Sequence, residues 1–136
     1  MKVGLIGHSQ LREFHIDSLN INHENIEVAK FWRSGARVSS ILDTHVFENF
    51  ISFHPDLVII FLGGNDITYD CSPSQIEQSF KELINVINFE INPNLGIFIL
   101  EIEKRYPNEY FVNEEKYKKV RRSLNKRMRE VRNSNL

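Results

Sequence analysis

Residues 57–66, L-V-I-I-F-L-G-G-N-D, decide the fold of this chain. The first six are all apolar, which is typical of a strand buried on both faces in the middle of a parallel sheet. A Gly-Gly pair ends the run, so Asn65 follows the C-terminal end of that strand. In open α/β sheets, ligands bind in the crevice outside the carboxyl ends of the strands. The stretch therefore predicts a central strand and places Asn65 at the binding edge.

Strand and helix patterns alternate on both sides of this stretch. The apolar runs predict strands at residues 3–6, 26–32, 57–62 and 95–100. Helical spacing and turn residues predict helices at residues 10–19, 38–53 and 72–89, and from about residue 113 to the end. Glu27 and Lys30 make the second strand an edge strand. The order βαβαβαβα predicts an α/β fold, a parallel sheet with helices on both faces.

Length and composition indicate one soluble globular domain. The chain has 136 residues, of which 41% are hydrophobic and 26% charged. Residues 116–132 hold nine Lys or Arg and one acid, whereas the rest holds eight basic and seventeen acidic residues. Cys71 is the only cysteine, which excludes an intrachain disulfide. No apolar run is close in length to the about 20 residues that a membrane-spanning helix needs. The N-terminus lacks a signal-peptide pattern. We expect a cytoplasmic protein.

Three short segments carry candidate chemistry. Ser9 ends G-H-S after the first strand, where its hydroxyl could act as a nucleophile or simply cap the next helix. Gly35 could offer its backbone N–H to a ligand or allow a tight turn. Asn65 could point its amide across the strand ends or serve as a turn residue. A hydroxyl, a backbone N–H and a carboxamide at one edge are the groups of a serine nucleophile beside an oxyanion hole.

The chain resembles the SGNH (GDSL-type) hydrolases in three segments, which are G-H-S-Q-L, Gly35 and D-L-V-I-I-F-L-G-G-N-D. The resemblance implies a flavodoxin-like three-layer sandwich with strand order 2-1-3-4 and no fifth strand in this chain. It implies Ser9 as nucleophile, Gly35 and Asn65 in the oxyanion hole, a small acyl-ester substrate and no cofactor. G-H-S-x-L-R and P-D-L-V-I-I-x-L-G-G-N-D also resemble the SGNH-like domains of proteins derived from animal transposable elements.

The chain departs from the family pattern at the residues that would supply the catalytic base for the serine. His8 stands where the family usually has Asp, and no Asp-x-x-His follows Leu100. Topology places His23 and His54 at the opposite edge, His45 down its helix and His15 two turns along the first helix. We expect His8, adjacent to the serine, to be packed or hydrogen-bonded rather than to act as base.

Three explanations stay open for the missing base. The preferred hypothesis is that residues 1–136 are a single domain truncated at its C-terminus. Alternatively, the chain could be a relative that keeps the oxyanion pocket only for binding. The third alternative is that the base comes from another copy of the chain. Truncation would leave the strand at residues 95–100 as an apolar edge and favour self-association.

Other site classes are weaker. Cys71 lies in the loop after G-G-N-D but lacks a histidine partner, and we expect an incidental thiol. Metal-ligand spacing is absent, and Gly4 and Gly7 do not form a dinucleotide fingerprint. Asp66 is expected to cap the following turn. The basic C-terminal helix could bind nucleic acid as an alternative function, although a solvated outer face is the simpler reading.

Overall fold

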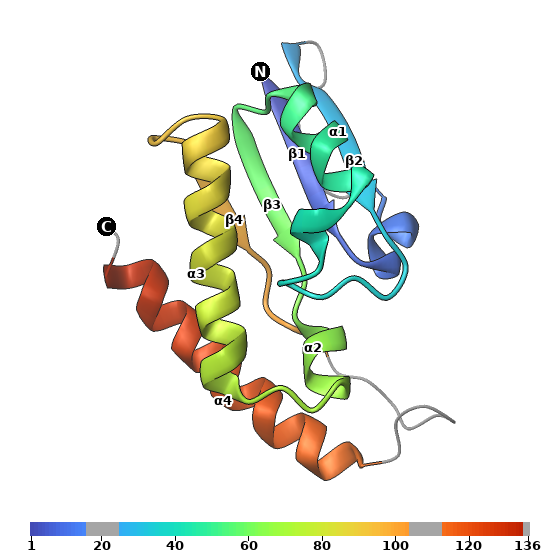
Figure 1. Ribbon diagram of the computed structural model, residues 1–136, viewed down its shortest axis with the longest axis vertical. Coiled ribbons are helices and arrows are strands. Elements are labelled where there is room, and N and C mark those ends of the chain that lie inside the picture. Colours follow the sequence, from blue (N-terminus) through green and yellow to red (C-terminus); the bar gives the residue numbers. More distant parts are fainter. Residues whose placement is uncertain (16–24, 104–112, 135–136) are drawn as a thin grey trace.

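The computed structural model describes residues 1–15, 25–103 and 113–134, with side chains up to residue 129, and contains a four-stranded parallel sheet (Figure 1). The strands are β1 (Lys2–Gly7), β2 (Glu27–Trp32), β3 (Leu57–Phe61) and β4 (Gly96–Ile99). Their order is β2-β1-β3-β4, so the predicted order and the edge position of β2 are confirmed. The all-apolar stretch forms β3 in the interior of the sheet, as expected.

One face of the sheet carries most of the hydrophobic core. In β3, Val58 and Ile60 are buried on this face, where α1 (His45–Phe53) and α3 (Pro73–Glu90) cover the sheet (Figure 1). On the opposite face, Val3 and Leu5 pack with Leu11 of η1, the 3-10 helix Ser9–Glu13. This smaller cluster lies beneath the segment that follows β1, so it fixes the loop that carries Ser9.

Two of the predicted helices are shorter than expected. The helix predicted at residues 10–19 is the single 3-10 turn η1, and residues 16–19 lie outside the described part of the chain. The helix predicted at residues 38–53 is divided into η4 (Ile41–Asp43) and α1. The hydroxyl of Thr44 accepts the N–H of Phe47 at 3.2 Å and caps α1, which explains the interruption. A short helix, α2 (Gly64–Thr68), was not predicted, because its sequence has the composition of a turn.

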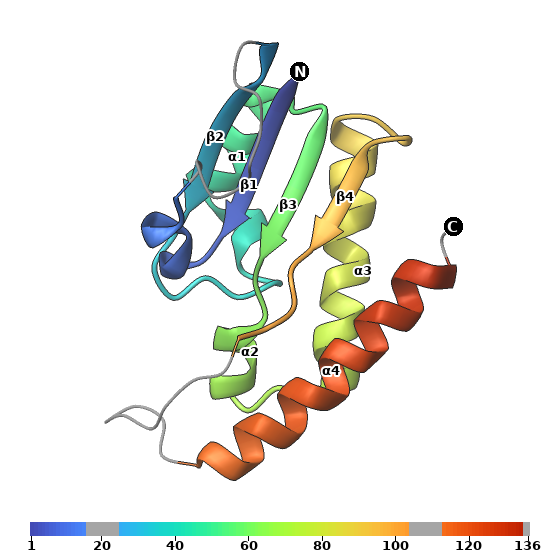
Figure 2. The same cartoon turned by 180° about the vertical axis from the view of Figure 1, so that it is seen from behind.

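The last two helices agree better with the sequence. Ser72 and Gln75 form a capping box ahead of α3, and Pro73 occupies its first turn. Helix α4 (Glu114–Ser134) crosses α3 and packs against α2 and α3 (Figure 2). Helix α4 buries Tyr117, Leu124 and Met128, whereas Val120 is half-buried. None of the described helices is long and apolar enough to span a membrane.

Candidate active site

The register of the sheet brings the three sequence segments to one edge. Gly7 pairs with Trp32 of β2 and with Phe61 of β3, so these three strands end level with one another. The loops that follow lie together at that end of the sheet (Figure 1). They carry the three candidate residues, at two, three and four positions beyond the strand ends: Ser9, Gly35 and Asn65.

Ser9 is half-buried and is the first residue of η1. It is not the N-cap, because His8 takes that position and its Nδ1 accepts the N–H of Gln10 at 3.2 Å. The capping alternative for Ser9 is therefore wrong. A Cβ on Gly7 would lie 2.3 Å from the carbonyl oxygen of Phe61, so only glycine lets the chain turn here so close to β3. The His8 N–H then donates to the same carbonyl oxygen at 3.2 Å, which fixes the start of the Ser9 loop.

His8 is packed and hydrogen-bonded, as expected. Its side chain is buried, and the lone pair of Nδ1 is used by Gln10. A neutral imidazole with Nδ1 as acceptor carries its proton on Nε2, so neither nitrogen offers a lone pair to the Ser9 hydroxyl in this arrangement. The structure thus supplies a reason, beyond sequence adjacency, why His8 is a poor base here.

Within the described residues, His54 and His45 do not contact Ser9. His54 ends α1 with a φ of 54° and precedes β3, at the opposite edge of the sheet. His45 is the first residue of α1, which corrects the expectation that it lies well down a helix. Its imidazole is 93% exposed and pairs with Glu48 at 3.0 Å. His15 follows η1 and is exposed, and His23 lies outside the described residues.

Gly35 and Asn65 belong to loops that are bonded to each other. The Asn65 side-chain amide donates to the carbonyl oxygen of Ala36 at 2.9 Å. Gly35 has a φ of +73°, and a Cβ there would meet no atom within 4 Å. Its glycine is therefore required by the backbone conformation rather than by packing. The structure places the glycine loop and the Asn65 amide together, as the sequence predicted.

Asp66 makes a contact that its prediction as a turn cap did not include. Its carboxylate accepts the N–H of Val38, with both oxygens 3.2 Å from the nitrogen, and only 2% of the residue is exposed. It thus joins α2 to the loop after Gly35, beside the bond made by Asn65. Sequence reasoning missed this contact. The only signal for this contact in the sequence is that an acidic residue directly follows Asn65.

Two guanidinium–aromatic pairs lie on the same loops. Arg12 lies over the ring of Trp32 at 5.6 Å, and Arg37 over the ring of Tyr69 at 4.7 Å.

Cys71 is a free, half-buried thiol whose backbone N–H donates to the Asp66 carbonyl oxygen at 3.1 Å. Within the described ranges, no cluster of three or more His, Cys, Asp or Glu residues could hold a metal ion.

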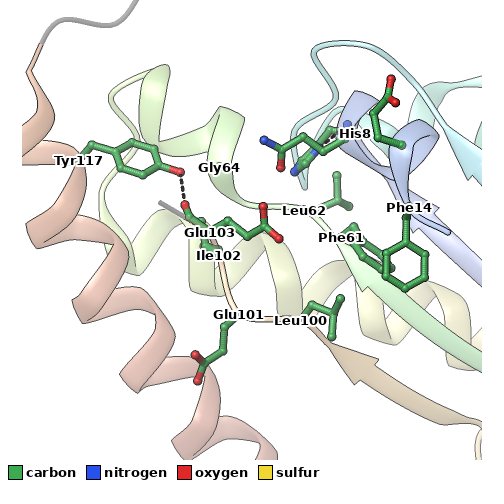
Figure 3. A pocket seen from close by; sticks show the side chains of 12 residues that line it. His8, Phe14, Phe61, Leu62, Gly64, Leu100, Glu101, Ile102, Glu103 and Tyr117 are labelled. Carbon is green, nitrogen blue, oxygen red and sulfur yellow. Dashed lines mark hydrogen bonds between the residues drawn. The ribbon is translucent and has the colours of Figure 1, made fainter. Parts of the chain in front are cut away.

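A cavity of about 360 Å³ adjoins these loops on the side of β4 (Figure 3). Ser9, Gly35 and Asn65 do not line it. Chain neighbours of two of them do, since His8 and Gln10 flank Ser9, and Gly64 precedes Asn65. The remaining wall comes from four sources, namely the end of η1 with Glu13 and Phe14, the end of β3, the segment after β4, and Tyr117 of α4. A ligand held at Ser9 could extend into this cavity over the backbone of His8 and Gly64.

Comparison with protein-family models gives a match over most of the chain. Residues 13–135 match the model of the GDSL-like lipase/acylhydrolase family. The matched range includes Gly35 and Asn65, and Ser9 lies just ahead of it. Comparison with curated protein sequences gives no match.

Solved structures of similar fold are distant in sequence. A member of the lipolytic protein G-D-S-L family from Veillonella parvula has a TM-score of 0.74 and 16% identity, over 99% of this chain and 74% of that one. A catalytic mutant of the acetylxylan esterase Axe2 from Geobacillus stearothermophilus gives 0.60 and 18%, over 94% and 73%. The esterase EstA from Pseudoalteromonas gives 0.58 and 15%, over 91% and 73%. At these identities the likeness shows the α/β fold.

Proposed function

Because this chain belongs to the GDSL-like lipase/acylhydrolase family, we propose that it is an SGNH-type acyl-ester hydrolase domain with Ser9 as its nucleophile. The backbone N–H groups of Ser9 and Gly35 and the amide of Asn65 would form the oxyanion hole. The observation that carries the proposal is the 2.9 Å bond from Asn65 to Ala36, because it joins two of the three loops at the edge where Ser9 lies.

The reaction would proceed through an acyl-serine. Ser9 Oγ attacks the ester carbonyl carbon, the negative charge on the carbonyl oxygen is stabilised by the N–H donors, and the bond to the alcohol breaks. Water then releases the acid and regenerates the hydroxyl. The Ser9 proton needs an acceptor, and Nδ1 of His8 is already bonded to Gln10. The acceptor would therefore be a group other than that nitrogen. Without one, the site would bind the ester and not cleave it.

A fluorophosphonate probe tests the nucleophile directly. The probe phosphonylates an activated serine with loss of fluoride, which intact mass spectrometry detects. We expect one adduct on the wild type, none on Ser9→Ala, and one on the matched control Ser74→Ala, whose serine is exposed at the start of α3. An adduct that persists in Ser9→Ala would reject Ser9 as the nucleophile. A folded wild type without adduct would leave a binding role for the pocket.

A second candidate function rests on the outer face of α4. Four of its cations, Lys118, Lys119, Arg122 and Lys126, make no ion pair among the described residues. Three others pair with the body of the protein: Lys116 with Asp70, Arg127 with Glu77 and Arg129 with Glu101. Like charges three and four residues apart destabilise a helix, so a bound polyanion would relieve their repulsion. The four unpaired cations would contact nucleic acid phosphates.

Salt-dependent RNA retention distinguishes this candidate from a merely solvated face. We expect retention at about 50 mM salt that is lost at about 200 mM, and loss at both concentrations when all four cations are replaced by Gln. Absence of binding at the lower salt concentration would reject it.

We also propose that β4 pairs with a second copy of the chain. Among the described strands β4 is an edge strand, and no charge or proline protects it. Phe98 is 44% exposed on this strand. Light scattering at high concentration should show a dimer that Phe98→Lys dissociates, and a strictly monomeric wild type would contradict the proposal.

A further inference from the structure

The cavity beside Ser9 has an apolar floor. Phe14, Phe61, Leu62 and Leu100 contribute it, and the rings of Phe14 and Phe61 meet edge to face at 5.0 Å (Figure 3). Apolar pockets with a few convergent polar groups are the usual form of a small-molecule site. The floor therefore suits an apolar portion of a ligand, and the charged groups around it decide which ligand is preferred.

All the charged residues that line this cavity in the described part are acids. Glu13 pairs with Arg12 at 3.0 Å in an exposed contact, and Glu101 pairs with Arg129 of α4. The carboxylate of Glu103 makes no ion pair or hydrogen bond within the described residues. Figure 3 shows its side chain extending from the wall toward Leu62 and His8. Among the described residues, one exposed carboxylate on the cavity wall thus has no ion-pair partner.

The Glu103 backbone is held in place, which fixes where that charge sits. Tyr117 donates its hydroxyl to the Glu103 carbonyl oxygen at 3.0 Å. One residue earlier, Asn125 bonds both the N–H and the carbonyl oxygen of Ile102, at 2.9 and 3.3 Å. Two residues of α4 therefore anchor the wall that carries the carboxylate, so the charge is presented by a supported segment.

We propose that this cavity binds the cationic end of the substrate, an ester with a positively charged, amine-type group on an apolar body. The inference rests on the proposed function, because it places the reacting carbonyl at Ser9. Glu103 would pair with the charge, and the edge-to-face rings of Phe14 and Phe61 would contact the apolar body and the cation. Glu103 is then a specificity residue and takes no part in the chemistry.

Binding of small probes tests this without any turnover. NMR titration of the full chain with 2-phenylethylammonium, and with the neutral, similarly shaped 2-phenylethanol, reports on the amides of Leu62, Gly64 and Ile102. We expect the ammonium to bind about fivefold to tenfold more tightly, and Glu103→Gln to remove that preference while binding of the alcohol stays unchanged. The matched control Glu90→Gln, exposed at the end of α3, should retain the preference. Equal affinity of the wild type for both probes, or no shifts at these amides, would overturn the proposal.

Failure of this inference can be distinguished from failure of the proposed function. Ser9→Ala should bind the ammonium as the wild type does, because Ser9 does not line the cavity. Ammonium preference without fluorophosphonate labelling would support the cation pocket and count against hydrolysis by this chain. Labelling without ammonium preference would support the nucleophile and reject the cation pocket.

Discussion

The carboxylate of Asp66 holds the backbone N–H of Val38, with both of its oxygens 3.2 Å from that nitrogen. Asp66 belongs to α2, directly after β3, whereas Val38 lies in the loop that follows β2. Two strand-end loops are thereby joined across the end of β1, which lies between these strands. Burial of a carboxylate that is 2% exposed is costly unless hydrogen bonds replace the water it has lost, and the Val38 N–H supplies such a bond.

Removal of this carboxylate should destabilise the protein. We expect Asp66→Ala to lower the free energy of unfolding by about 2 kcal/mol, because the buried Val38 N–H loses a charged acceptor. Urea denaturation measures the change. Asp43→Ala, at an exposed acid in η4, is the matched control and should change the free energy by less than about 0.5 kcal/mol. Equal effects of the two substitutions would show that the Asp66 contact contributes little.

Two glycines of the motifs should differ in their tolerance of alanine. At Gly7, a Cβ would lie 2.3 Å from a backbone oxygen of β3, so Gly7→Ala should cost about 3 kcal/mol or more. At Gly35 a Cβ meets nothing, and only the φ of +73° opposes it, so Gly35→Ala should cost about 1 kcal/mol. Thermal unfolding of both variants checks the ranking, and a larger loss at Gly35 would contradict it.

The sheet could be predicted from the sequence because each strand has a local signal. The unbroken apolar run of β3 and the charges of β2 indicate interior and edge positions without knowledge of the rest of the chain. The helix predicted at residues 38–53 is longer than the observed α1, because the apolar spacing continues through a region where Thr44 caps a new helix. Periodicity detects a buried face and does not detect a side chain that ends one helix and begins another.

The candidate site was only partly predictable for a similar reason. Ser9, Gly35 and Asn65 stand at strand ends, and the strand ends were visible in the sequence. The contacts of Asp66 and Asn125 pair side chains with backbone groups 28 and 23 residues away. Such pairings depend on how loops and helices cross the end of the sheet, which no local pattern records.

Asn125 should contribute more to stability than its place on a basic helix suggests. Its amide bonds both backbone groups of buried Ile102, in place of a neighbouring strand. Asn125→Ala should therefore cost about 2–3 kcal/mol, because both groups lose a partner in a buried position. Chemical denaturation measures the loss, and the adjacent exposed Lys126→Ala serves as control. A change at Asn125 no larger than that at Lys126 would rule out this anchoring role.

The ion pair between α3 and α4 should make stability depend on pH in the acid range. The side-chain hydrogen bond from Arg127 lowers the pKa of Glu77, with Lys81 adding to the effect and burial opposing it. A carboxyl with a lowered pKa stabilises the fold above its ordinary pKa and loses that contribution as pH falls through the lowered value. Arg127→Ala should therefore cost about 0.5 kcal/mol near pH 7 and progressively less as the pH falls through the lowered pKa of Glu77.

Denaturation midpoints of wild type and Arg127→Ala across this pH range measure the difference. Arg122→Ala, which removes an exposed cation that makes no ion pair in the described part, should show no such convergence at low pH. If Arg127→Ala still lowers stability at the lowest pH, packing of the Arg127 side chain rather than its charge accounts for the lost stability.

Asn65 is expected to have two separable roles, one in holding the glycine loop and one in stabilising the oxyanion. Asn65→Ala should slow phosphonylation of Ser9 by a fluorophosphonate about 100-fold, the usual effect of losing one oxyanion donor. Asp66→Ala weakens the same junction of loops but leaves the Asn65 amide in place. It should therefore slow labelling far less when both variants are compared under folding conditions. Equal slowing would show that Asn65 acts only by holding the loop, and that the oxyanion is stabilised by other groups.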